Sequence, residues 1–258
     1  MPETQLNVCM LAHTPDPVVT TALAGRLCYS DSDILSLQEG VRGRAPQFVE
    51  KLASLGHLSP FEHVSFTFGV EGVSRALLAQ ITRHRIASFS VQSQRYVKQN
   101  GGNHVVPPSI AALGPEAVAR FEAQMDTIWG FYSEWLEAGI PAEDARFVLP
   151  NAAETRMVFT MNARELMHFF SLRCCGRAQW EIRRLAWCML GLVRREAPEL
   201  FGKCGPHCIG GACSEGKMTC GRQAEMRACS EALTALAESG ADDAAILAWT
   251  LANIHNEN

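Results

Sequence analysis

The sequence predicts a protein of mixed α/β (α+β) class that folds as a single domain. Within residues 61–70, one face carries Val64, Phe66, Phe68 and Val70 and the other carries His63, Ser65 and Thr67, which is the period of a half-buried strand. Residues 115–138 repeat apolar side chains at helical spacing and end at Gly139 and Pro141. Other strand and helix patterns alternate along the chain, and its 258 residues fit one large domain.

The remaining elements follow in chain order. A strand covers residues 6–13, and Asp16 with Pro17 opens a helix that continues to Leu27. The later elements are helices at 45–55 and 73–83, a strand at 155–161, and helices at 162–173, 178–196 and 223–253. No repeat, low-complexity tract or obvious linker interrupts this order, so we expect one continuous domain.

The composition argues against broad electrostatic partners. The formal net charge is -4 and the pI is about 6.1, so we expect neither a nucleic-acid backbone nor a membrane surface as a partner. The N-terminus lacks a signal pattern and no apolar run is long enough to span a bilayer, which predicts a soluble, cytoplasmic protein. Of 23 basic residues only four are lysines; arginine suits phosphate binding, although codon bias explains the excess equally well.

Ten cysteines are more than an intracellular chain of this length usually carries. Cys204, Cys208, Cys213 and Cys220 lie within seventeen residues, but their spacing is looser than the paired pattern of most zinc sites. A metal site, reduced structural thiols and a disulfide all remain open for this segment, and no metal is assigned.

The stretch RHRIASFSVQSQRY, residues 83–96, carries the clearest chemical pattern. Its first three residues are consecutive basic side chains that cannot all point the same way, so they serve one wide ligand or two ligands. Ser88, Ser90, Ser93 and Arg95 add the hydroxyl and guanidinium donors that a phosphate or nucleotide needs. The alternative is a set of solvated charges stabilised at a helix C-terminus.

This stretch resembles the signature of the flavin-dependent thymidylate synthases, which is Arg-His-Arg, seven residues, Ser, one residue and Arg. The resemblance extends to SPFEHVSFTF (59–68), Gln80, ARFVLP (145–150), NARELMHFFSLR (162–173) and AQWEIR (178–183). The Pro-Cys-His nucleophile block of the classical, flavin-independent enzymes is absent, because residues 205–208 read Gly-Pro-His-Cys.

The resemblance implies a fold, an assembly and a reaction. The fold is a central, mostly antiparallel sheet flanked by helices, with residues 1–200 as the catalytic domain and residues 201–258 as an extension of it. The assembly is a homotetramer with shared active sites. The reaction is methylation of dUMP to dTMP, with 5,10-methylenetetrahydrofolate as methylene donor and FAD reduced by NADPH as hydride donor, and without a cysteine nucleophile.

The resemblance also assigns residues to ligands. The residues matched to FAD are His63, Ser65, Arg83, His84, Arg85, Ile86, Val91, Asn162, Ala163, Arg164 and His168. The residues matched to dUMP are Gln80, Arg83, Gln92, Ser93, Gln94, Arg95, Arg146 and Arg173. Arg173 is the predicted catalytic residue, because a fixed cation beside the uracil ring favours its ionisation. Val91 replaces an acidic residue of many relatives and His168 replaces an asparagine.

Two other classes of function are weighed against this one. A non-catalytic nucleotide- or flavin-binding protein would keep the pocket without turnover, and the intact signature with Arg173 argues against it. A metal-stabilised regulatory or nucleic-acid module built on the cysteine segment is disfavoured by the net acidity and by the lack of interleaved basic and aromatic residues.

Overall fold

The computed structural model describes residues 4–99 and 102–254. The strands are β1 (Asn7–His13), β2 (Ser65–Ser74), β3 (Ala87–Val91) and β4 (Glu154–Asn162). The α-helices are α1 (Pro17–Leu27), α2 (Ile34–Val41), α3 (Ala45–Ser54), α4 (Arg75–Ile81), α5 (Pro108–Ala111), α6 (Pro115–Glu137), α7 (Ala142–Ala145), α8 (Ala163–Arg173), α9 (Trp180–Glu196), α10 (Pro198–Phe201), α11 (Gln223–Glu238) and α12 (Asp243–Asn253). The short 3-10 helices are η1 (Arg42–Arg44), η2 (Ser59–His63), η3 (Arg146–Val148), η4 (His207–Ile209) and η5 (Gly216–Met218).

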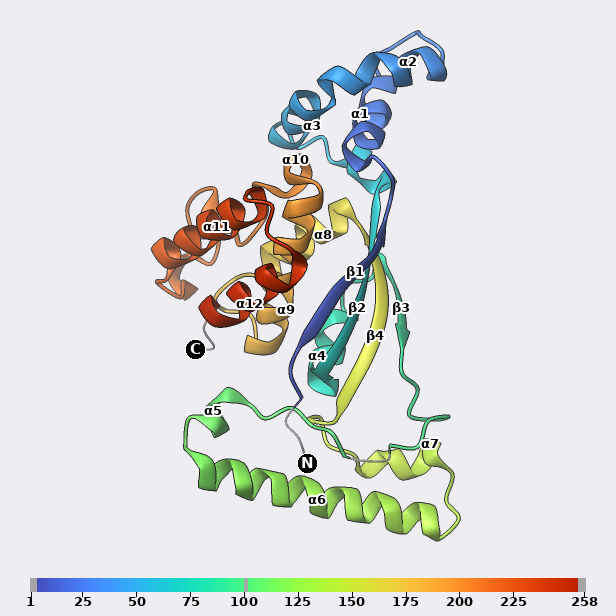
Figure 1. Ribbon diagram of the computed structural model, residues 1–258, viewed down its shortest axis with the longest axis vertical. Coiled ribbons are helices and arrows are strands. Elements are labelled where there is room, and N and C mark those ends of the chain that lie inside the picture. Colours follow the sequence, from blue (N-terminus) through green and yellow to red (C-terminus); the bar gives the residue numbers. More distant parts are fainter. Residues whose placement is uncertain (1–3, 100–101, 255–258) are drawn as a thin grey trace. The chain divides into compact units, whose positions relative to one another are not determined.

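The strands form one antiparallel sheet in the order β1-β2-β4-β3 (Figure 1). The β1–β2 pairing illustrates the direction: Asn7 bonds Glu71 through its side chain, whereas Thr14 bonds the carbonyl of Ser65. Partner numbers therefore rise on one strand as they fall on the other, as antiparallel pairing requires. The predicted α/β (α+β mixed) class with an antiparallel sheet is confirmed.

The chain divides into two compact units, and each of the four strands contributes residues to both. Unit 1 comprises residues 1–7, 69–83 and 89–158; unit 2 comprises residues 8–68, 84–88 and 159–258. Residues 201–258 all belong to unit 2. The division of the sequence into a catalytic domain and an extension at residue 200 stays a prediction.

Unit 1 contains α4 and the long helix α6 (Figure 1). Met125 and Trp129 of α6 are buried and pack with Ala153, while α5 and α7 pack along α6. The turn at Gly72 requires glycine, because its φ is +70° and a Cβ there would lie 2.0 Å from the carbonyl oxygen of Gln5. These contacts position the start of α4 and the segments on either side of it.

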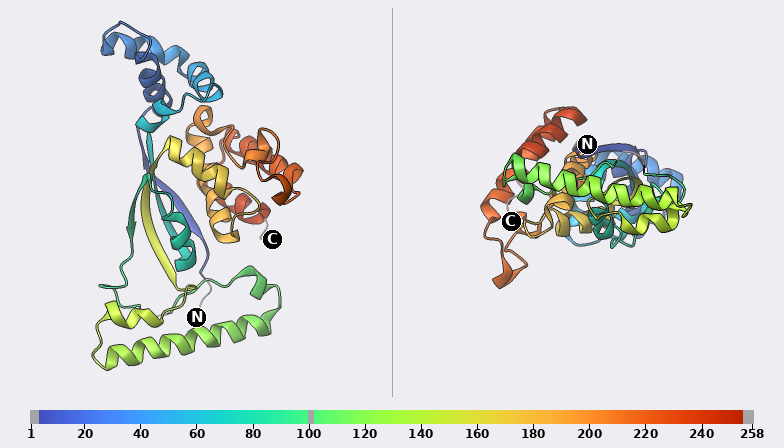
Figure 2. Two further views of the ribbon diagram at one scale, coloured as in Figure 1. Left: turned by 180° about the vertical axis from the view of Figure 1, so that it is seen from behind. Right: turned by 90° about the horizontal axis from the view of Figure 1, so that it is seen from below.

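Unit 2 has α9 at its centre, in contact with α8, α10, α11 and α12 (Figure 2). Its helix α9 is buried along most of its length, and even Arg194 is only 2% exposed. The alternation predicted for β2 is confirmed here, because Val64, Phe66 and Phe68 are all fully buried. Among the described residues no helix is long and apolar enough to cross a membrane.

The structure corrects two boundaries near β2. The strand begins at Ser65 and not at residue 61, because residues 59–63 form the 3-10 helix η2 with Pro60 in its first turn. At its other end β2 continues to Ser74, whose hydroxyl accepts a hydrogen bond from the Leu77 N–H and caps α4. The helix predicted at 73–83 is therefore shorter.

The helical prediction was wrong at two further places. Helix α2 was not expected, since its eight residues fall below the length at which helical periodicity is clear. The single helix predicted over 223–253 is two helices. Gly240, with a φ of +80°, follows the end of α11, and Asp242 caps α12 by accepting from the Ala245 N–H at 2.8 Å.

Candidate active site

The predicted ligand residues separate between the two units. All the predicted dUMP residues lie in unit 1 except Arg173. All the predicted FAD residues lie in unit 2 except Arg83 and Val91. A separation of this kind did not follow from the sequence, in which the two sets are interleaved within residues 80–95.

In unit 1, Glu143 of α7 connects two predicted dUMP arginines. Arg95 Nε donates to the Glu143 carboxylate at 2.8 Å, and Arg146 Nε donates to the Glu143 carbonyl at 2.9 Å. The Ser93 hydroxyl accepts from the Arg95 N–H at 3.1 Å, which fixes the turn that carries this arginine. Two guanidinium groups are thus held near one another, in an arrangement suited to a phosphate.

Buried polar groups lie beside these arginines. Gln94 is 9% exposed, and its Nε2 atom is buried without a hydrogen-bond partner. A buried amide without a partner costs free energy unless a ligand or water completes it. Arg75 donates from Nη2 to the Gln92 carbonyl at 3.0 Å, and its Nε is likewise buried without a partner. Burial first, and then the charge of Arg146, lowers the pKa of Arg75.

Two predicted dUMP residues of unit 1 remain, Gln80 in α4 and Arg83 just after it. Gln80 lies half-buried in the last turn of α4, and its carbonyl accepts from the Arg83 N–H at 3.3 Å. Arg83 itself is exposed. Both side chains stand at the end of a helix, where a bound ligand can reach them.

In unit 2, His84 lies between Glu165 and Arg173. His84 is 4% exposed; its Nδ1 is 2.8 Å from a Glu165 oxygen, and Arg173 Nε donates to its Nε2 at 3.1 Å. The His84 ring also packs edge-on against Phe169, with centroids 5.0 Å apart. Both ring nitrogens are therefore used within the protein, so a flavin contact at this position would come from the His84 backbone.

The hydrogen bonds define the protonation state of His84. Burial lowers the pKa of His84 from 6.5, and the positive charge of Arg173 acts in the same direction, while the hydrogen bond to Glu165 opposes both. Because Nε2 accepts from Arg173, the single ring proton lies on Nδ1 and is donated to Glu165. The histidine of the signature is thus neutral near pH 7.

The first turn of α8 lies beside the start of β2. Asn162 Oδ1 accepts from the Glu165 N–H at 2.8 Å and caps the helix, and the Ala163 N–H donates to the Val64 carbonyl at 2.8 Å. Arg164 is exposed and forms an ion pair with Glu62. The Asn162 oxygen and the Ala163 N–H are thus committed to the protein.

The other predicted FAD residues of unit 2 offer accessible groups. His63 in η2, His168 in α8 and Arg85 are exposed, and Ser65 is half-buried at the start of β2. Ile86, between Arg85 and Ala87, is 65% exposed and offers an apolar surface. Cationic, imidazole and apolar groups together fit a ligand with a diphosphate and an aromatic ring system. Val91, in unit 1, is half-buried.

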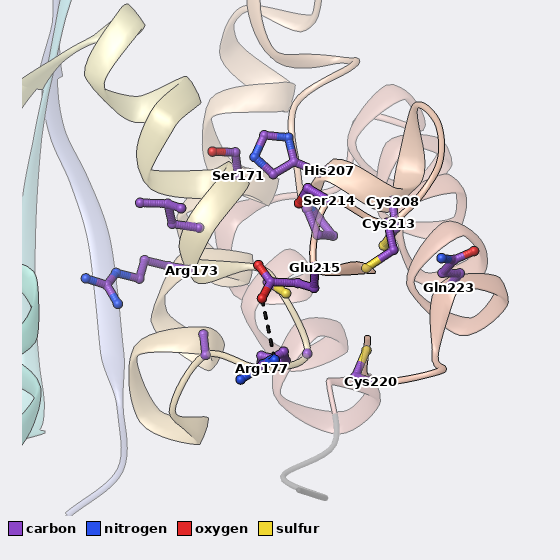
Figure 3. A pocket seen from close by; sticks show the side chains of 15 residues that line it. Ser171, Arg173, Arg177, His207, Cys208, Cys213, Ser214, Glu215, Cys220 and Gln223 are labelled. Atoms are coloured by element: carbon purple, nitrogen blue, oxygen red, sulfur yellow. Dashed lines mark ion pairs between the residues drawn. The ribbon is translucent and has the colours of Figure 1, made fainter. Parts of the chain in front are cut away.

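The cysteine segment differs from the prediction in one member. Cys204 does not line the cavity that the other three share: its Sγ donates to the Leu200 carbonyl, and burial raises its pKa to about 12. Cys175 takes its place, because the side chains lining a cavity of about 340 Å³ include Arg173, Cys175, Cys208, Cys213 and Cys220 (Figure 3). In Figure 3 the Arg173 guanidinium points away from the labelled cysteines.

Neither a metal nor a disulfide is seen at this segment. Within residues 4–99 and 102–254, no three His, Cys, Asp or Glu side chains are grouped so that they could hold a metal ion. All ten cysteines lie in this described part of the chain and are free thiols. The hydrogen bond from Thr219 lowers the pKa of Cys213, whereas burial raises the pKa of Cys175 and Cys208.

Sequence reasoning missed three residues that contact the predicted site. Glu165 occupies the third position of α8 after an asparagine cap, where glutamate usually turns back to cap the helix itself. Its carboxylate binds His84 instead, and nothing in the sequence joins residues 81 positions apart. Arg75 and Glu143 were missed because single charged residues near helix ends are usually solvated. Only the folded chain reveals their partners.

Comparisons with known proteins identify the family of this chain. A family model described as "Thymidylate synthase complementing protein" matches residues 9–199. The flavin-dependent thymidylate synthase of Geobacter sulfurreducens is 52% identical over 225 residues, covering 86% of this chain and 97% of the relative. The flavin-dependent thymidylate synthase of Clostridium tetani is 46% identical over 238 residues, covering 86% of this chain and 96% of the relative.

This chain is also similar to a solved structure of a nucleotide methylase. The crystal structure of the UMP/dUMP methylase PolB from Streptomyces cacaoi, bound with 5-Br dUMP, matches with a TM-score of 0.66 and 25% identity. The match covers 77% of this chain and 93% of PolB. The fold and the signature define a member of a flavoenzyme class that methylates pyrimidine nucleotides. This chain belongs to the flavin-dependent thymidylate synthase family, and the family predicted from its sequence is confirmed.

Proposed function

We propose that this enzyme converts dUMP to dTMP, taking a methylene group from 5,10-methylenetetrahydrofolate and a hydride from FAD that NADPH has reduced. The names of its relatives and the nucleotide analogue bound to PolB support thymidylate synthesis as the reaction. The folate donor and the reductant rest on the family resemblance of the signature.

One feature of unit 1 carries the proposal most directly. Arg95 and Arg146 both donate hydrogen bonds to Glu143, and the neighbouring Gln94 has a buried Nε2 atom without a hydrogen-bond partner. A nucleotide monophosphate supplies what this arrangement needs, namely a dianion for the guanidinium groups and polar base or sugar atoms for the amide. The predicted role of these residues is to bind and orient dUMP.

The residues present in unit 2 also fit FAD. Exposed Arg85 and Arg164 can bind the diphosphate, and the exposed Ile86 side chain offers apolar surface to a ring system. FAD supplies a hydride when it is bound and reduced. The protein residues contribute binding and orientation, and the exposed imidazoles of His63 and His168 can donate hydrogen bonds to the cofactor.

Arg173 is proposed to act by its charge. A guanidinium keeps its proton at any working pH, so it stabilises a developing negative charge on the uracil ring without transferring a proton. A cysteine nucleophile is not part of the proposal. Unit 1, which carries the other dUMP residues, contains none of the ten cysteines.

We also propose a cytoplasmic homotetramer with shared active sites. Tyr96 and Phe147 directly follow Arg95 and Arg146 and are 80% and 84% exposed in the single chain. Large exposed aromatic side chains beside predicted ligand residues favour a second subunit that covers them. Mass measurement in solution tests the assembly. Mixing Arg95→Ala chains with Arg164→Ala chains tests the shared site, because some mixed sites would contain intact halves only.

The reaction itself is tested with purified protein. Protein supplied with FAD, dUMP, methylenetetrahydrofolate and NADPH under anaerobic conditions should form dTMP, and its flavin spectrum should change when dUMP is added. Cys175 is the cysteine nearest to Arg173 in the sequence whose thiol is not buried. Because no cysteine nucleophile is proposed, the Cys175→Ser variant should retain turnover. Normal flavin and nucleotide binding with no dTMP formed would favour the non-catalytic binding protein instead.

A further inference from the structure

Helix α8 presents one stripe of side chains to His84. Glu165, Phe169 and Arg173 are spaced four residues apart, so they lie on the same face of the helix. Each of them contacts the His84 ring: Glu165 at Nδ1, Phe169 at the ring edge and Arg173 at Nε2. One helix face therefore surrounds a single imidazole.

The contacts form a directed series of hydrogen bonds. The Glu165 carboxylate accepts the Nδ1 proton of His84 at 2.8 Å, which leaves the Nε2 lone pair open. That lone pair accepts the Nε–H of Arg173 at 3.1 Å. If Glu165 did not accept at Nδ1, the ring proton could move to Nε2, where it would face the donor of Arg173.

Burial makes this order of donors and acceptors strict. His84 is 4% and Glu165 7% exposed, so water cannot easily replace either partner. Arg173 is half-buried, and its Nε is directed to the histidine and not to solvent. The planar guanidinium is thereby fixed in orientation, since holding Nε defines the plane of its other two nitrogens.

We propose that Glu165 is a positioning residue for the reaction, acting through His84 to orient the guanidinium of Arg173. This inference rests on the proposed function, because it assigns Arg173 to the uracil ring. It gives the histidine of the signature a role different from binding FAD through its ring. It also explains why a carboxylate is buried at a helix start that Asn162 already caps.

The test is a double-mutant cycle on turnover. Glu165→Gln should lower kcat about a hundredfold, as expected when a catalytic group is misplaced by roughly 1 Å, while KM for dUMP and FAD affinity change little. Arg173→Lys keeps the charge but removes the Nε–H. In that background Glu165→Gln should change kcat less than about threefold, because residues of one network are not additive.

Two further variants make the cycle decisive. Glu196→Gln is the matched control, since Glu196 forms another glutamate–histidine pair, 3.1 Å from His13, and should leave kcat unchanged. His84→Phe keeps a ring against Phe169 but has no ring nitrogens. If Glu165→Gln does not fold, His84→Phe replaces it in the cycle. It should then lower kcat in the wild-type background and have little further effect on kcat in the Arg173→Lys background. Effects that multiply in the double variant, or wild-type kcat in Glu165→Gln, would overturn the proposal.

The stability of the same set of variants can be measured by urea unfolding, and this measurement does not depend on the reaction. Glu165→Gln and Arg173→Lys should shift the midpoint non-additively even if the protein formed no dTMP. Loss of the reaction in the wild type would then refute the proposed function alone. Additive midpoints would refute the connection between Glu165 and Arg173.

Discussion

Arg95 provides the sharpest test of the dUMP site. Its only described ion pair is with Glu143, at 2.8 Å, and the two side chains are 51% and 46% exposed. An exposed pair of this kind contributes about 0 to 1 kcal/mol, so Glu143 holds the guanidinium only weakly. A charge-assisted hydrogen bond to phosphate is worth about 1.5 to 3 kcal/mol, so Arg95→Ala should weaken dUMP binding roughly ten- to a hundredfold.

The assay is a titration of FAD-loaded protein with dUMP, followed by flavin absorbance. FAD affinity should not change in Arg95→Ala. Glu143→Gln removes a carboxylate that competes with the phosphate for Arg95, so dUMP should bind as tightly as before or up to about fivefold more tightly. Arg120→Ala is the matched control, because Arg120 is an exposed arginine of α6 in the same unit.

Three results would refute this reasoning. Loss of FAD as the main defect of Arg95→Ala would assign the guanidinium to the cofactor. Equal weakening by Glu143→Gln and Arg95→Ala would mean that the carboxylate positions the arginine and does not compete for it. Equal weakening by Arg120→Ala would show that only the total charge of the unit matters.

Three further predictions follow from pKa values and buried contacts. Because burial lowers the pKa of His84 below 6.5, the neutral ring is favoured above that pH, and turnover should fall only as the pH drops through the lowered pKa. A profile of kcat between about pH 5 and 8 measures this, and a midpoint above pH 6.5 would contradict it. The Thr219 hydrogen bond lowers the pKa of Cys213, whereas the pKa of Cys204 is about 12. Iodoacetamide should therefore modify Cys213 before Cys204, and peptide mass mapping would show the order of modification. The reverse order would contradict this prediction. Arg194→Leu leaves several buried carbonyls without their donor and should lower the free energy of unfolding by roughly 3 kcal/mol or more, measured in urea; a loss below about 1 kcal/mol would contradict it.

The regular elements could be predicted wherever one periodicity covers a full element. The alternation of Val64, Phe66 and Phe68 identified β2, and the apolar repeat over residues 115–138 identified α6 to within one residue. The errors fall where a local side chain decides a boundary. A capping hydroxyl at Ser74 and a left-handed glycine at Gly240 outweigh the apolar pattern around them.

The predicted site could be reached from the sequence only through residues in the blocks that match the family. Arg95 and Arg146 are in matched blocks, and the structure adds that Glu143 joins them. Glu165 and Glu143 escaped prediction for one physical reason. Their contacts are with residues far away in the chain, and such contacts depend on tertiary packing that no local pattern encodes.

The three consecutive basic residues of the signature differ in their surroundings. Arg83 belongs to unit 1, whereas His84 and Arg85 belong to unit 2. Arg83 and Arg85 are exposed, but His84 is buried with both ring nitrogens engaged by α8. The three consecutive basic residues, expected to serve one wide ligand or two, are therefore two exposed cations with a buried histidine between them. The histidine serves the site through Arg173, so replacing it should impair turnover more than the binding of either ligand.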